Sequence, residues 1–407
     1  MTGRPAALLV SSIALVATAA PASGANTLRA VAAAHLPALE RAQQPSSVGD
    51  ADAMQARYDV ARAIVEELHG RASPECGPAL RALGAYARAN IAAAEAFDRE
   101  ASRTAVEARV RATAAAARRG LAGCAVGQLS LDRRTTPRVP APPLPPSSAL
   151  PVRAEKHDRP LEARLEALAR GFNGYSAVVV HDLATGRTGS WNADASFPAA
   201  STVKLGVLVA ALRAAGARPE RSDVWYDLVQ ITRWSSNLAA NRLYARLGST
   251  AVETALRRMG ATASTYTGEY RVGTARDATP RQPPLVSQRV TTAHDLATVI
   301  ETIHEAAFGD AAALRAAKLS RHQAQLALGL LLGSKATGAN ASLFKGAWPP
   351  GTPVAQKNGW LSDAFHTAAI AYTPRGPVVY VLLTYRDGLT RAKAARLGAR
   401  VVAAALR

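Results

Sequence analysis

The sequence has only two cysteines and seven lysines, and after its first 25 residues it contains no long uninterrupted apolar run. Two cysteines without a suitable histidine cluster do not make a zinc site. The sequence also lacks a phosphate-cradling glycine loop and a dinucleotide fingerprint. We therefore expect neither a metal nor a cofactor. Because no later segment approaches about eighteen consecutive apolar residues, we expect no membrane contact once a signal is removed.

The 407 residues are 48% hydrophobic, which is typical of a globular protein of two or three units. The formal net charge of +19 comes almost entirely from arginine. These arginines are scattered along predicted helices and form no single block, which indicates solvated helix faces and no nucleic-acid partner. A basic surface can still favour an anionic polymer of the cell surface.

Residues 1–25 have the layout of a secretory signal. Arg4 provides a basic start, residues 6–20 are apolar, and small residues follow, with cleavage expected after Gly24 or Ala25. An uncleaved anchor is the alternative, although the apolar stretch is short for a span. The sequence predicts a secreted, extracytoplasmic protein of the cell envelope.

Residues 26–130 predict a small all-α domain, because apolar residues recur at spacings of three and four. Export to an oxidising compartment makes a disulfide between Cys76 and Cys124 reasonable. Such a bond requires residues 78–97 and 101–119 to form an antiparallel pair, since one continuous helix would separate the sulfurs by roughly 70 Å. No catalytic constellation appears here, and contact with the cell wall is a possible role.

Residues 131–160 are dense in proline and predict an extended spacer. Residues 161–407 begin with a helical segment and a β-branched hairpin, continue through helical segments, and end with two strand-like runs and a helix from about Arg391. Strands at both ends that enclose helices predict an α+β domain. We expect an antiparallel sheet flanked by helices, with a helical subdomain.

The first chemical motif is Ser201-x-x-Lys204, at the opening of an apolar helix. Residues three apart share a helix face, so the hydroxyl and the amine can meet. A serine hydroxyl needs a neighbouring base, and a lysine amine can serve when its surroundings lower its pKa, whereas a guanidinium cannot. Alone, this spacing is weak, because an N-cap serine followed by a solvent-exposed lysine gives the same pattern.

Two further triplets follow in the sequence. Ser235-x-Asn237 offers a hydroxyl that can relay a proton and an amide that can hold a carbonyl, although both residues also cap helices. Residues 357–359 (Lys-Asn-Gly) precede an alternating strand pattern. A lysine there can hold a carboxylate, and a glycine lets the strand approach a ligand closely.

In this order, the three triplets resemble those of the class A β-lactamase and penicillin-binding protein superfamily, over about residues 162–407. The resemblance implies a serine hydrolase in which Ser201 is acylated, Lys204 assists as base and Ser235 carries a proton to the leaving nitrogen. The backbone N–H groups of Ser201 and Trp360 would hold the oxyanion. The substrate would be bound by Asn237, Lys357, Asn358, Gly359 and Trp360.

The sequence departs from the family in three places. Asn358 replaces the usual Thr or Ser, and the short interval from Lys204 to Ser235 predicts a trimmed helical subdomain. The Glu-x-x-Leu-Asn pattern that supplies the deacylation base is incomplete, with Glu269 followed by Val272 and Gly273. Glu269 is either that base or an ordinary surface-loop carboxylate.

The leading hypothesis is an exported β-lactamase that opens the lactam amide through an acyl-enzyme. A D-alanyl-D-alanine carboxypeptidase or transpeptidase would apply the same chemistry to a peptidoglycan peptide. A third hypothesis is a catalytically inactive module that binds the cell wall. The expected partner is therefore a β-lactam or a peptidoglycan peptide.

Overall fold

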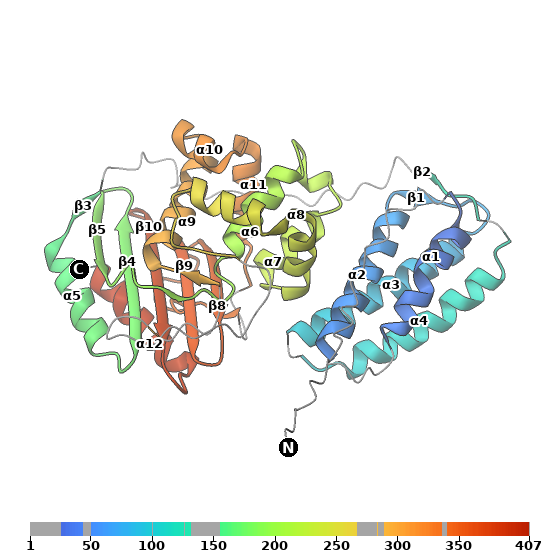
Figure 1. Ribbon diagram of the computed structural model, residues 1–407, viewed down its shortest axis with the longest axis horizontal. Coiled ribbons are helices and arrows are strands. Elements are labelled where there is room, and N and C mark those ends of the chain that lie inside the picture. The colour runs from blue at the N-terminus through green and yellow to red at the C-terminus, as the bar shows by residue number, and fades with distance from the viewer. Residues whose placement is uncertain are drawn as a thin grey trace, which may run out of the picture. The chain divides into compact units, whose positions relative to one another are not determined.

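The structure, a computed structural model, describes residues 26–43, 50–99, 101–125, 127–131, 155–266, 283, 289–335 and 340–406. The chain divides into two compact units, Met1–Thr135 and Thr136–Arg407. Figure 1 shows an all-helical first unit apart from one short strand pair, and a second unit that combines a sheet with helices. The predicted signal at residues 1–25 lies outside the described residues, so it stays a prediction.

The described part of the first unit is a helical bundle. A short strand pair, β1 (Arg71–Ala72) with β2 (Ser130–Leu131), closes one end. The helices are α1 (Leu28–Arg41), α2 (Asp50–Leu68), α3 (Gly77–Asp98) and α4 (Thr104–Ala122).

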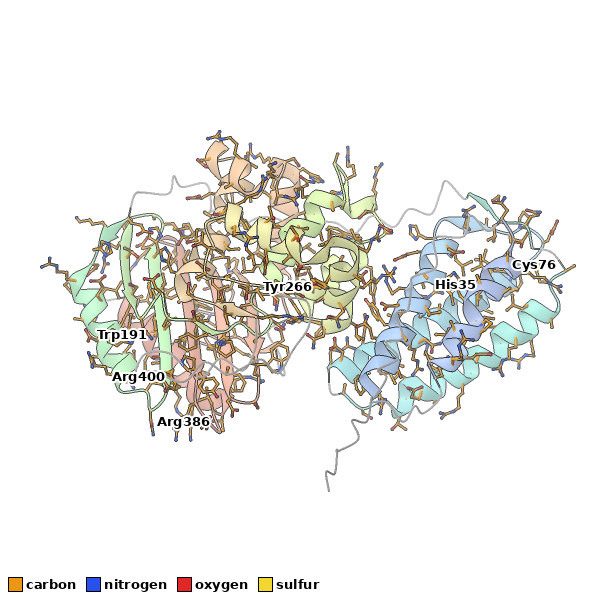
Figure 2. All side chains as sticks on the ribbon, in the orientation of Figure 1. His35, Cys76, Trp191, Tyr266, Arg386 and Arg400 are labelled. Carbon is orange, nitrogen blue, oxygen red and sulfur yellow. A yellow bond between two sulfur atoms is a disulfide. The ribbon has the colours of Figure 1, made fainter. Side chains whose placement is uncertain are left out.

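A disulfide joins Cys76 to Cys124, with their Cα atoms 5.6 Å apart (Figure 2, where Cys76 is labelled). Cys76 immediately precedes α3 and Cys124 follows α4, so the two helices run antiparallel as a hairpin. Gly127 lies against this bond with a φ of +61°, and a Cβ there would come within 2.7 Å of the Cys124 sulfur. The turn therefore requires a glycine.

A buried arginine links the helices of the first unit. Arg57 donates to both carboxylate oxygens of Glu107, at 2.7 and 2.9 Å, and to Oδ1 of Asn90 at 2.7 Å. The hydrogen bond from Arg57 lowers the pKa of Glu107. Because Arg57 is only 2% exposed, this paired charge stabilises one arrangement of α2, α3 and α4.

The second unit is built on a six-stranded sheet in the order β3-β5-β4-β10-β9-β8. All neighbours pair antiparallel except β3 and β5, which are parallel. This arrangement confirms the predicted α+β class. The strands are β3 (Lys156–His157), β4 (Tyr175–Asp182), β5 (Arg187–Trp191), β8 (Val354–Trp360), β9 (Ala364–Thr373) and β10 (Gly376–Tyr385).

Helices cover both faces of the sheet (Figure 1). On one face, α5 (Arg159–Arg170) and α12 (Arg391–Ala405) pack over a core that includes Val178 and Val180. Side chains alternate along a strand, so Val179 and His181 face the other side, where α9 (Ala293–Phe308) packs. Both β3 and the start of α5 fall within residues 131–160, so regular structure begins earlier than the predicted spacer boundary.

The remaining helices gather beside the edge strand β8 and include a kink in α8 at Gly248, whose φ is +74°. A short pair, β6 (Phe197–Pro198) with β7 (Val290–Thr291), leads the chain into this part. The remaining helices of the second unit are α6 (Lys204–Ala214), α7 (Trp225–Arg233), α8 (Asn237–Arg258), α10 (Ala311–Ala317) and α11 (Arg321–Leu332).

Among the described residues of the whole chain, none of the helices combines the length and the apolar character needed to cross a bilayer.

Candidate active site

Ser201 lies in a tight turn between β6 and α6. The turn continues into the helix through i to i+3 bonds, including one from the Lys204 N–H to the Ser201 carbonyl at 3.3 Å. Ala200, immediately before it, has a φ of +48°. Left-handed backbone at a residue other than glycine is sparsely populated and concentrates at functional sites. Ser201 is 8% exposed, so its hydroxyl is held in a nearly enclosed position.

Lys204 is buried at the first position of α6 and is 3% exposed. Its Nζ donates to the Ser235 carbonyl at 2.7 Å, the Ser236 carbonyl at 3.2 Å and Oδ1 of Asn237 at 2.7 Å. The first motif is thereby tied to the second. The solvent-exposed alternative for this lysine does not describe the structure.

The two serines before α8 have different tasks. Ser236 caps the helix, because its Oγ accepts from the Ala239 N–H at 3.2 Å. Ser235 is left out of the cap and has a φ of +61°, again in the left-handed region. Its buried hydroxyl accepts a 2.6 Å hydrogen bond from Nζ of Lys357. The capping role expected of this motif therefore falls to Ser236 and leaves the Ser235 hydroxyl available for chemistry.

Lys357 extends from β8 to the hydroxyl of Ser235. It is 2% exposed, and its Nζ also donates to the Asn358 carbonyl at 2.7 Å. Burial lowers the pKa of Lys357 well below its ordinary value, and the charge of Lys204 lowers it further. The structure thus brings two amines and a serine hydroxyl into one buried network, with residues drawn from α6, the α7–α8 connection and β8.

Gly359 brings the edge strand against the turn that carries Ser201. A Cβ on Gly359 would lie 2.9 Å from the Ser201 backbone nitrogen, so no other residue fits without displacement. Leu361 donates to the Ala364 carbonyl on β9. Because hydrogen-bonded pairs alternate along an antiparallel ladder, the N–H of Trp360 points away from β9, at the open edge of the sheet. The strand edge that carries the Trp360 N–H thus lies against the turn that carries the Ser201 N–H.

Asn358 is placed differently from its neighbours. Its side chain is 2% exposed, accepts from the Thr367 hydroxyl at 2.8 Å and donates to the Asn340 carbonyl at 2.8 Å. Alternation along β8 turns it to the side opposite Lys357. We expected Asn358 to bind substrate. In the structure its amide joins β8 to β9 and to the loop at Asn340, and its contact with a substrate stays a prediction.

His366, which lies in none of the three triplets, joins β9 to β6 and to β10. It pairs with Gly359 across the sheet, its Nε2 lies 2.7 Å from the Pro198 carbonyl, and Nδ1 accepts from the Thr384 N–H at 3.3 Å. The proton therefore sits on Nε2. No sequence pattern marks His366, because its pairing with Gly359 depends on the register of β9 with β8. Glu269 lies outside the described residues, so its placement stays a prediction.

Residues 160–223 and 227–406 match the beta-lactamase enzyme family. This match covers more than half of the chain and contains every candidate site residue of the three triplets. No curated protein matches the sequence at a significant level.

Several solved structures are similar to part of this chain, and PBP-A shares its fold. PBP-A is 18% identical with a TM-score of 0.50, and the match covers 62% of this chain and 97% of PBP-A. The beta-lactamase from Sphaerobacter thermophilus DSM 20745 is 20% identical with a TM-score of 0.47, over 61% of this chain and 96% of that one. The beta-lactamase from Desulfarculus baarsii DSM 2075 is 24% identical with a TM-score of 0.49, over 61% and 97%.

Proposed function

Because the chain belongs to the beta-lactamase enzyme family, we propose that it is an exported serine hydrolase that opens β-lactams through an acyl-enzyme on Ser201. The observation that carries this proposal is the buried network of Lys204, Ser235 and Lys357 beside the Ser201 turn. A surface serine with an ordinary lysine would not be enclosed in this way.

In the proposed reaction, Lys204 first gives up one of the three protons that it donates in hydrogen bonds. Oγ of Ser201 then forms a bond to the lactam carbonyl carbon while the Lys204 amine takes the hydroxyl proton. The carbon–nitrogen bond then breaks, and Ser235 delivers its proton to the departing nitrogen while Lys357, which donates to the Ser235 oxygen, replaces that proton. Lys357 supports this step, because its 2.6 Å hydrogen bond fixes the Ser235 oxygen. Asn237, held by Lys204, would orient the substrate amide.

The oxyanion would be held by the backbone N–H groups of Ser201 and Trp360. The tight approach of Gly359 to the Ser201 nitrogen and the outward direction of the Trp360 N–H support this assignment. Preorganised donors of this kind typically contribute about 3 to 4 kcal/mol each to the transition state.

Glu269 is the proposed base for water that hydrolyses the acyl-enzyme. The incomplete pattern around it leaves room for a second candidate function, a D-alanyl-D-alanine peptidase whose acyl-enzyme with a lactam persists. Residues 1–25 would direct the chain out of the cell. The helical unit would contact the cell wall.

The test is intact-mass analysis after mixing with benzylpenicillin, together with turnover of a chromogenic cephalosporin. We expect an adduct on wild type that is absent from Ser201→Ala. Prompt turnover supports the lactamase, whereas a stable adduct without turnover supports the peptidase. If wild type forms no adduct, turns over no cephalosporin and is retained on isolated cell wall, the chain is a binding module and the enzymatic proposal is wrong.

A further inference from the structure

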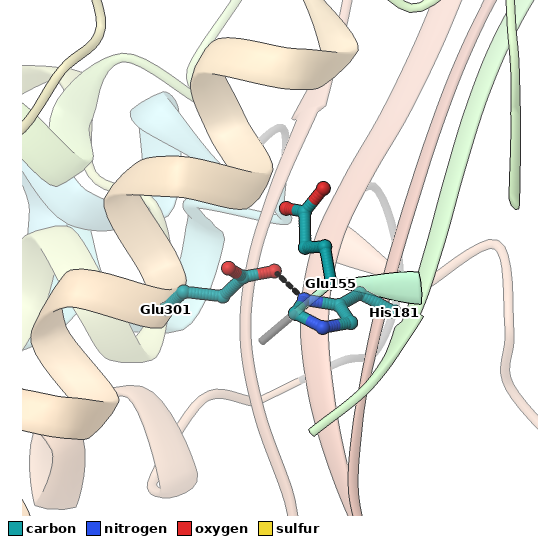
Figure 3. Close-up of side chains that lie close together, drawn as sticks. All are labelled: Glu155, His181 and Glu301. Atoms are coloured by element: carbon teal, nitrogen blue, oxygen red, sulfur yellow. Dashed lines mark hydrogen bonds and ion pairs between the residues drawn. The ribbon is translucent and has the colours of Figure 1, made fainter. Parts of the chain in front are cut away.

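A second cluster of chemically active side chains lies where β4 meets α9, on elements that carry none of the proposed catalytic groups. His181 from β4 is 3% exposed, and its Nδ1 lies 3.1 Å from Oε1 of Glu301 on α9 (Figure 3). Glu155, immediately before β3, brings its carboxylate to the same place. One ligand atom of each of the three residues lies within 4.8 Å of the others.

The cluster has an excess of negative charge. In the described part of the chain, neither lysine nor arginine forms an ion pair with Glu155, Glu301 or Glu305, although basic residues outnumber acidic ones by 49 to 30. His181 is the basic side chain of this cluster, and it faces the carboxylates of Glu155 and Glu301. A divalent cation would add positive charge between them.

The ligand types select the kind of cation. One imidazole and two carboxylates suit Zn²⁺, which accepts nitrogen and oxygen ligands at about 2.0 to 2.2 Å in tetrahedral geometry. Neighbouring ligand atoms in such a tetrahedron are roughly 3.3 Å apart. The 3.1 Å separation between His181 and Glu301 is close to that spacing, and Glu155 is exposed and free to close the remaining distance. We propose that Glu155, His181 and Glu301 form a Zn²⁺ site with one position left for water.

The far side of the His181 ring limits the affinity of this site. Nε2 is buried and has no hydrogen-bond partner, so no contact on that side fixes the tautomer. Nδ1 can therefore lose its proton to a cation without breaking a second hydrogen bond. Nε2 would then carry the ring proton without an acceptor, which should make binding weaker than in a closed structural zinc site.

The test is calorimetric titration of the full, tag-free, chelator-treated chain with Zn²⁺ alone, at pH 7.5. We expect one saturable site per chain, and visible absorption of a low-coordinate complex when Co²⁺ replaces Zn²⁺. His181→Gln should weaken binding by about 100-fold or more. The matched control is His322→Gln, which removes an exposed His–Glu pair of similar spacing, 3.2 Å from Glu220. It should leave the titration unchanged.

Glu155→Gln provides a second variant, because this exposed residue can change without disturbing the core. It should also weaken binding. The proposal is wrong if wild type shows no saturable site, or if Glu155→Gln and His181→Gln bind Zn²⁺ as wild type does. Ser201→Ala should bind Zn²⁺ normally, so this result is independent of the proposed hydrolysis.

Discussion

The Nζ atom of Lys357 lies 2.6 Å from Oγ of Ser235, although the two residues are 122 positions apart in the chain. Both side chains are buried. This bond ties the edge strand β8 to the turn before α8. It also gives the Ser235 hydroxyl one defined orientation, which a proton-transfer group requires.

Replacement of Lys357 by methionine tests this relationship. Lys357→Met keeps the length of the side chain and removes the donor. The acylation rate should fall by about 10- to 100-fold, because this is the change in rate that corresponds to the free energy of one charge-assisted hydrogen bond. Stopped-flow acylation with a chromogenic cephalosporin measures the effect. Lys345→Met, at an exposed lysine of the same unit, is the control. Equal acylation rates in the two variants would show that Lys357 takes no part in the reaction.

A second prediction concerns the contact between β8 and the Ser201 turn. In Gly359→Ala the new Cβ would lie 2.9 Å from the Ser201 nitrogen and 3.1 Å from side-chain atoms of Ala200 and Thr202. Overpacking of this kind typically costs about 1 to 3 kcal/mol in unfolding free energy. Because the displaced groups include both proposed oxyanion donors, acylation should fall by about 100-fold or more.

The control for this change is Gly171→Ala, where a Cβ would meet only ordinary contacts at 3.4 Å and beyond. Denaturant unfolding and acylation kinetics on the two variants separate stability from rate. A Gly359→Ala enzyme that acylates at the wild-type rate would contradict the assignment of this strand edge.

Much of the fold could be predicted because local patterns and the final structure agree. The β-branched run at residues 177–180 forms β4, and the alternating run after Gly359 forms β9. The boundary of the second unit was harder to predict. Asp158 caps α5 by accepting from the Leu161 N–H, and the helix begins with Arg159 and Pro160 inside a stretch whose many prolines predict a spacer.

The candidate site could be predicted only in part, because sequence spacing identifies residue types and not side-chain directions. Alternation along β8 puts Lys357 and Asn358 on opposite sides, and which side meets the other triplets depends on packing that the triplet does not reveal. His366 and the cluster around His181 join segments more than 100 residues apart. No local pattern records such contacts.

Asn358 should affect stability more than chemistry. Asn358→Ala leaves the Asn340 carbonyl and the Thr367 hydroxyl without their buried partner, so unfolding free energy should fall by about 1 to 3 kcal/mol. The apparent KM for a β-lactam should change little. Steady-state kinetics beside chemical denaturation check this pair of expectations. A large rise in KM at unchanged unfolding free energy would instead show that Asn358 binds the substrate.

His366 makes the stability of the second unit depend on pH. Burial lowers its pKa from 6.5 to about 4, against the weaker opposing effect of its hydrogen bonds to the backbone. Between these two values the unfolded chain binds the proton and the folded chain does not. Stability is therefore lost as pH falls from about 6.5 toward 4.

Comparison with His366→Gln isolates this contribution, because glutamine can still donate to the Pro198 carbonyl but does not titrate. Relative to that variant, wild type should lose about 3 kcal/mol of unfolding free energy between pH 6.5 and 4. Urea unfolding of both proteins across this range provides the measurement. Subtraction removes the similar contribution of His304, whose burial also lowers its pKa to about 4. A difference that stays constant with pH would show that His366 is not held neutral by its surroundings.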